Sequence, residues 1–134
     1  MSSPLFESED IKELEKGIVS FNKGDFWQCH EDLEDWWIEH QFEPRVNFVW
    51  AIIQVATAIF HAQRNNIKGA QSQLAKAKKK ISKVHSFRIA DAQTEKLFHW
   101  SDFCEKVESL GENASISDIM NLSRFKFEGF FEAK

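Results

Sequence analysis

The sequence has no tyrosine and only two proline, two cysteine and five glycine residues among its 134 positions. So little proline and glycine argues against a disordered or loop-rich chain. Cys29 and Cys104 lie far apart and form no CxxC pattern, which excludes a disulfide framework and a cysteine zinc site. They are expected to be reduced, buried thiols of a cytoplasmic protein.

Membrane and secretion signals are also missing. The first ten residues contain no basic region followed by an apolar run, so no secretory signal is expected. Residues 46–62 carry no charge, but they include Asn47, Gln54 and His61. They also fall short of the roughly 20 apolar residues of a membrane span. We interpret this segment as the central core helix and expect no membrane contact.

Acidic residues are absent between Glu43 and Asp91, an interval with nine Lys and Arg, whereas residues 1–43 hold twelve acids and three bases. This asymmetry favours attraction between helical hairpins over a partner-binding surface. Four lysines in the basic interval share one helical face: Lys76, Lys79, Lys80 and Lys83. No aromatic residues alternate with them and the net charge is −4, so the pattern favours a solvated face over a phosphate or RNA site.

Helical periodicity is the dominant pattern that is present. Hydrophobic residues make up 43% of the chain, with thirteen Phe and five Trp, and apolar positions recur at helical spacing. The expected helices cover approximately residues 8–22, 25–40, 44–64, 66–83 and 90–110, with a short one after Ser115 or Ser117. Ser8 and Asp25 are the expected N-caps of the first two. The Phe-rich tail, RFKFEGFFEAK, either forms a final packed turn or docks on a partner.

A faint internal repeat lays Gly24–His30 over Asn65–Gln71, at an offset of 41 residues. Both segments are short turns that open a helix, as in helical hairpins of the tetratricopeptide kind. We therefore predict an all-α, single-domain antiparallel bundle of five to six helices with helical-hairpin character over residues 1–134.

Polar residues recur in two of the expected helices. His30 and Glu34, four residues apart, share one helix face. Asn47, Gln54 and His61 recur every seven residues and form one stripe on the apolar helix. Because an unsatisfied buried polar group costs roughly 1–3 kcal/mol, this stripe needs partners, and the preceding helix offers the nearest ones.

The spacing His30-Glu31-x-x-Glu34 is similar to the metalloprotease HExxH signature, with its last histidine replaced by a carboxylate. His30, Glu34 and His61 are therefore candidate ligands for Zn, Mn or Fe. Glu31 is the candidate general base, and Gln54 could orient water or substrate.

A structural alternative needs no metal. Glu31 or Glu34 could pair with Arg45 and His30, while Gln54 and His61 fix the helix register. The chain would then be a non-enzymatic helical-hairpin binding module, and a metal-free pocket is a third possibility. A small molecule, a protein and a second copy of the chain all stay open as partners. The composition does not favour nucleic acid.

Two ordered motifs resemble the domain-of-unknown-function family 309, labelled predicted metal-dependent hydrolase. They are Phe21-Asn22-x-Gly24-x-Phe26-Trp27-x-x-His30-Glu31-x-x-Glu34-x-x-Trp37, and Ile52-Ile53-Gln54-x-Ala56-x-Ala58-x-x-His61 followed by Asn66-x-x-Gly69-Ala70. The resemblance covers about residues 14–84 and leaves residues 90–134 outside. It implies an all-α fold and a divalent metal, with matching residues at His30, Glu31, Glu34, Gln54 and His61. Ala51 and Asn65 replace two glycines that are usual in the family.

Overall fold

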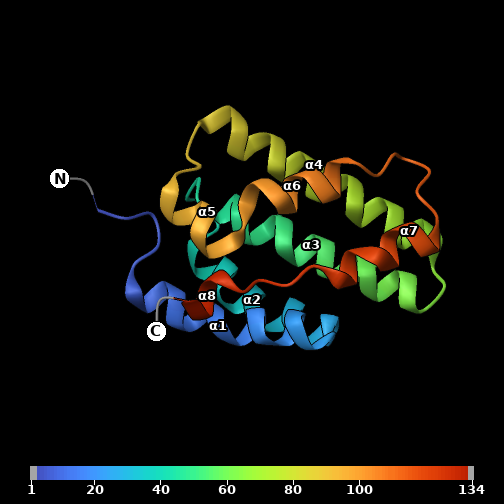
Figure 1. Cartoon of the computed structure of the whole chain (residues 1–134), viewed down its shortest axis with the longest axis horizontal. Coiled ribbons are helices and arrows are strands. Elements are labelled where there is room, and N and C mark those ends of the chain that lie inside the picture. The colour runs from blue at the N-terminus through green and yellow to red at the C-terminus, as the bar shows by residue number, and fades with distance from the viewer. Residues whose placement is uncertain (1–2, 133–134) are drawn as a thin grey trace.

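The computed structural model describes residues 3–132, and all secondary structure in this range is helical (Figure 1). This confirms the predicted all-α helical bundle. The elements are α1 (Ser8–Lys23), α2 (Phe26–His40), α3 (Val46–Gln63), α4 (Ile67–Phe87), α5 (Ala92–Phe98), α6 (Trp100–Glu108), α7 (Ile116–Met120), the 3-10 helix η1 (Asn121–Arg124) and α8 (Gly129–Glu132).

The first four helices pack as successive antiparallel hairpins, α1 on α2, α2 on α3 and α3 on α4 (Figure 1). The two turns of the internal repeat have the same cap. Asp25 accepts a hydrogen bond from Gln28 N at 3.2 Å, and Asn66 accepts one from Gly69 N at 3.0 Å. The N-cap predicted at Ser8 is wrong: Glu7 caps α1, in a capping box with Asp10.

Helix α3 is long and apolar enough to cross a membrane by length and composition alone. However, 72% of its 18-residue window is buried inside the bundle, in contact with α2, α4 and α7. The burial matches the central core helix expected from the sequence.

The helix predicted over residues 90–110 is instead interrupted at His99, whose φ of 47° lies in the left-handed region. Phe98 and Trp100 flank this break, and both are nearly fully buried. In one continuous helix, two residues separated by one would point to nearly opposite sides. The interruption lets both rings enter the same core, with centroids 6.4 Å apart.

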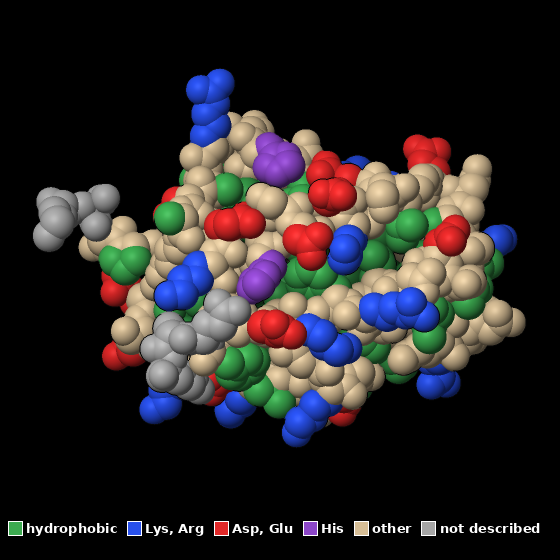
Figure 2. Space-filling view, in the orientation of Figure 1, with side chains coloured by type: hydrophobic (Ala, Val, Ile, Leu, Met, Phe, Trp, Pro, Cys, Tyr) green, Lys and Arg blue, Asp and Glu red, His purple; other side chains and the backbone are tan. Residues whose placement is uncertain are grey.

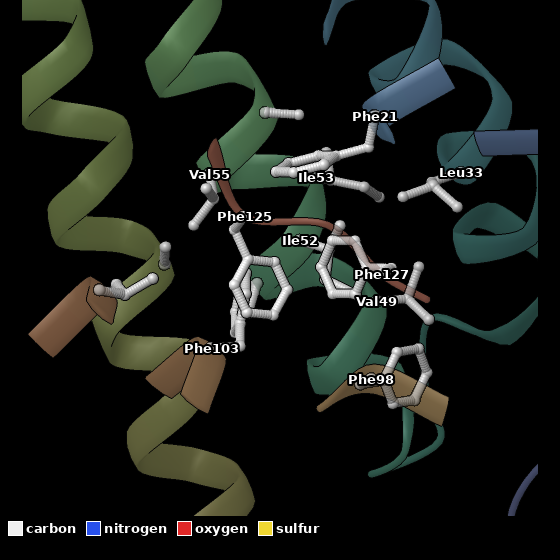
Figure 3. Close-up of a cluster of buried hydrophobic side chains, with 14 of the residues drawn as sticks. Phe21, Leu33, Val49, Ile52, Ile53, Val55, Phe98, Phe103, Phe125 and Phe127 are labelled. Atoms are coloured by element: carbon white, nitrogen blue, oxygen red, sulfur yellow. The ribbon is translucent and has the colours of Figure 1, made fainter. Parts of the chain in front are cut away.

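The Phe-rich tail closes the bundle. Phe125, Phe127 and Phe130 are buried, and Figure 3 shows the segment with Phe125 and Phe127 crossing the core beside α3. Asn22 of α1 clamps the backbone of Phe127, donating to its carbonyl at 3.0 Å and accepting from its N–H at 2.8 Å. On the face shown in Figure 2, acidic and basic side chains are interspersed with hydrophobic groups, without a patch of one sign.

Replacing Arg88 by glycine is expected to raise the free energy of unfolding by about 0.5–1 kcal/mol. Arg88 is exposed and ends α4 with a φ of 53°, a conformation that an L-residue adopts at a cost. Urea unfolding measures the gain. Gly24→Ala is the matched control and should lower the free energy of unfolding, because Gly24 has a φ of 86°. An added Cβ would meet no atom within 4 Å, so the backbone conformation alone is tested. A loss of stability in Arg88→Gly would contradict the strain argument.

Candidate functional site

A cleft of about 470 Å³ opens between α2, α3 and α4, and we call it the α2–α3–α4 cleft. Its lining is polar or cationic apart from two α3 residues: it comprises His30, Glu34, Trp50, Ile53, Gln54, Thr57, Gln73, Lys76, Lys79 and Lys80. Its volume falls in the range of small-molecule sites.

Two aromatic contacts set the register of α2 against α3. Trp27 packs on Phe60 and Trp37 on Trp50, with ring centroids 5.0 and 4.9 Å apart. In this antiparallel register, His30 is level with Thr57. The sequence prediction that α2 and α3 bring their polar residues together therefore holds for this part of both helices.

His30 and Glu34 point toward each other at the cleft. His30 Nε2 lies 3.0 Å from Glu34 Oε2, as the four-residue spacing predicts. The other ring nitrogen, Nδ1, is buried and has no hydrogen-bond partner. The Trp27 ring packs against the imidazole at a centroid distance of 4.7 Å, which holds it in place.

Gln54 is buried in α3, and its Oε1 lacks a hydrogen-bond partner although the residue lines the same cleft as His30. The other members of the predicted polar stripe have different partners. Asn47 donates to Pro44 O at 2.9 Å, and His61 Nδ1 lies 3.4 Å from Asn66 Nδ2. The stripe is therefore not one connected network, because its residues meet different parts of the chain.

His61 lies one helical turn beyond Thr57 and does not line the cleft. Within the described residues, the side chains that bring three possible metal-ligand atoms within 4.8 Å of one another are Glu13, Glu39 and His40. Sequence reasoning missed this group because Glu13 comes from α1 and has no spacing signal relative to α2. His30, Glu34 and His61 form no such group in this conformation, so the role of His61 stays a prediction.

Arg45 does not pair with Glu31 or Glu34, as the structural alternative expected. Its guanidinium instead donates to Asp10 at 2.7 Å, to Glu43 at 2.8 Å and to the carbonyl of Leu5 at 2.6 Å. Asp10 was not foreseen because it reaches Arg45 from α1, 35 residues earlier in the chain. The cleft is therefore free of a guanidinium group.

Asp10 also accepts a hydrogen bond from Trp36 Nε1 at 3.0 Å. Burial alone would raise the pKa of this carboxyl, but the hydrogen bonds from Trp36 and Arg45 outweigh it and hold the pKa below its ordinary value. The predicted general base, Glu31, is exposed and is not part of the cleft lining.

Lys80 departs from the solvated face expected for the lysines of α4. Lys76, Lys79 and Lys83 are exposed, but Lys80 is only 8% exposed. Its ammonium lies 4.1 Å from the ring centroid of Trp50. Burial, and then the nearby charges of Lys83, Lys79 and Lys76, lower the pKa of Lys80.

In comparisons with known proteins, residues 14–73 match the family model described as Domain of unknown function (DUF309). Over 61 residues the chain is 33% identical to "Uncharacterized protein YpuF" of Bacillus subtilis (strain 168), covering 46% of this chain and 35% of that protein. The chain thus spans about a third of the length of this curated relative. No solved structure matches. The segment that matches this family model contains α2, α3 and most of the residues that line their cleft.

Proposed function

We propose that the protein is a metal-dependent hydrolase that acts in the α2–α3–α4 cleft. The observation that supports this most is the 3.0 Å separation of His30 Nε2 and Glu34 Oε2. Two ligand atoms that each lie about 2.0–2.2 Å from one divalent ion are separated by about 3 Å. The buried Gln54 Oε1, which has no partner, adds an oxygen acceptor to the same cleft.

In this proposal His30 and Glu34 would hold the ion, and His61, which does not line the cleft, would join them through a change of side-chain rotamer. A divalent ion would supply Lewis acidity and lower the pKa of a bound water to about 7. Gln54 would orient water or substrate through its amide. Glu31, which follows His30 on α2 and is exposed outside the cleft lining, would accept a proton at the edge of the site. Trp27 keeps the imidazole plane fixed by packing against it.

The test is the metal content of protein purified without a His-tag, determined by elemental analysis. We expect about one equivalent of Zn, Mn or Fe per chain, lost in Glu34→Gln and His61→Ala. Glu39→Gln is the matched control, because it makes the same change on the same helix but in the Glu13–Glu39–His40 group. Metal loss in Glu39→Gln alone would move the ion to that group and contradict the proposal.

Turnover of chromogenic esters by the metal-loaded protein tests the second half of the proposal. Glu31→Gln should keep the metal and lose activity by about 10²–10⁴-fold, as removal of a general base does. Absence of both metal and turnover would leave the alternative, a non-enzymatic helical-hairpin module. His61→Ala would then act on stability alone, with a cost of about 1–3 kcal/mol.

A further inference from the structure

The most unusual charge in the bundle is Lys80. Lys80 is only 8% exposed, and it makes no ion pair with any residue among 3–132. The contact described for its ammonium is the face of Trp50, at 4.1 Å. The ammonium itself opens on the cleft, where a low exposure and the absence of a counter-anion favour binding of an anion.

Further cations lie at the same cleft. Lys76 and Lys79 line the cleft together with Lys80. Lys76 lies one helical turn before Lys80 on α4, and Lys79 directly precedes Lys80 in the sequence. The carboxylate among the lining residues, Glu34, is already paired with His30. Three lysines against one carboxylate leave the cleft lining with an excess of positive charge. Burial, and after it the charges of Lys83, Lys79 and Lys76, lower the pKa of Lys80.

The neutral part of the lining can also bind an anion. Gln54 and Gln73 carry amide N–H donors, and both line the cleft beside the lysines. Thr57 is less available, because its hydroxyl donates to Ile53 O at 2.8 Å. These ammonium and amide groups can all donate hydrogen bonds to a compact anion with several acceptor oxygens. A phosphate group is such an anion.

We propose that the α2–α3–α4 cleft binds the phosphate group of a small molecule through Lys76, Lys79 and Lys80, with Lys80 at its buried end. If the cleft is the hydrolase site of the proposed function, on which this part of the inference rests, its substrates are phosphate esters. Binding of phosphate itself requires neither the metal nor turnover. Free phosphate and a phosphomonoester share this chemistry, and separate titrations distinguish them.

The experiment is calorimetric titration of the EDTA-treated full chain with inorganic phosphate and, separately, with phenyl phosphate. Lys80→Met retains the apolar stem over Trp50 and removes the charge, so we expect at least tenfold weaker binding of both probes. Lys83→Met is the matched control: Lys83 belongs to the same basic helix face but does not line this cleft. It should change the dissociation constant less than twofold.

Lys80→Met is also expected to melt at a higher temperature than wild type without phosphate, and to lose the phosphate-induced rise in melting temperature. If this variant does not fold, the double variant Lys76→Gln/Lys79→Gln provides the same comparison from exposed positions. Tighter binding of phenyl phosphate than of phosphate supports an ester ligand, and equal binding supports the phosphate group alone.

No binding to wild type at millimolar phosphate, or equal weakening in Lys80→Met and Lys83→Met, overturns the inference. The two proposals fail separately. Lys80-dependent phosphate binding without metal binding would retain the phosphate site and remove the hydrolase. Metal binding and turnover that depend on Glu34, without phosphate binding that depends on Lys80, would retain the hydrolase and remove the phosphate site.

Discussion

Replacing Arg45 by alanine is expected to lower the free energy of unfolding by about 3 kcal/mol at pH 7, the scale for one partner of a buried ion pair. The side chains of Arg45 and Asp10 are 15% and 12% exposed. Without the guanidinium, Asp10 loses its cationic partner and Leu5 O loses a donor. The packing of Arg45 over the Phe6 and Trp36 rings, at 5.6 and 5.2 Å, is lost as well. Urea unfolding monitored by tryptophan fluorescence measures the difference.

The pH dependence of this loss identifies its cause. The pKa of Asp10 is lower in the folded protein than its ordinary value, so its contribution to stability is present at neutral pH. It disappears as the pH falls from about 4 through the folded pKa, because the protonated carboxyl no longer pairs with Arg45. The difference between wild type and Arg45→Ala should therefore shrink near pH 2. A loss of the same size at both pH values would show that packing, not charge, dominates.

Lys106→Ala is the matched control for an ion pair in solvent. Lys106 and Asp102 lie 3.3 Å apart, and their side chains are 50% and 55% exposed. Its expected cost is below about 1 kcal/mol, since exposed pairs contribute little. If Lys106→Ala and Arg45→Ala cost the same, the buried network around Asp10 has no special role in holding α1 to α2 and α3.

Phe127→Ala is expected to destabilise the protein by about 3–5 kcal/mol, the range for deletion of a buried aromatic ring. Phe127 is fully buried, and its ring centroid lies 5.0 Å from that of Phe21 and 5.6 Å from that of Phe103. It thus joins α1 to α6 across the core, as Figure 3 shows for this part of the tail. Thermal and urea unfolding provide the measurement.

Phe42→Ala is the control for Phe127→Ala, because Phe42 is 94% exposed and should change stability by less than about 0.5 kcal/mol. Phe127→Leu should lose less than Phe127→Ala, since it leaves a smaller cavity. A tail that only rests on the surface would instead make Phe127→Ala as mild as Phe42→Ala.

The helices were predictable wherever they depend on residues close together in the sequence. The apolar spacing of α1 to α4 was visible in the chain, and Asp25 and Ser115 cap their helices through bonds within three residues. The His30–Glu34 pair was predictable for the same reason, because four residues bring two side chains to one helix face. The break at His99 was not, since it depends on where Phe98 and Trp100 find space in the assembled core.

Local patterns in this chain thus establish a helical bundle, an apolar central helix and a His–Glu pair on α2. Packing between distant segments determined the partners of two charged side chains. Arg45 pairs with Asp10 instead of Glu31 or Glu34, and Lys80 packs over Trp50. The physical reason is the same in both cases. The burial and partners of a charged side chain depend on helices that no fixed spacing relates, and only the folded bundle brings those helices together.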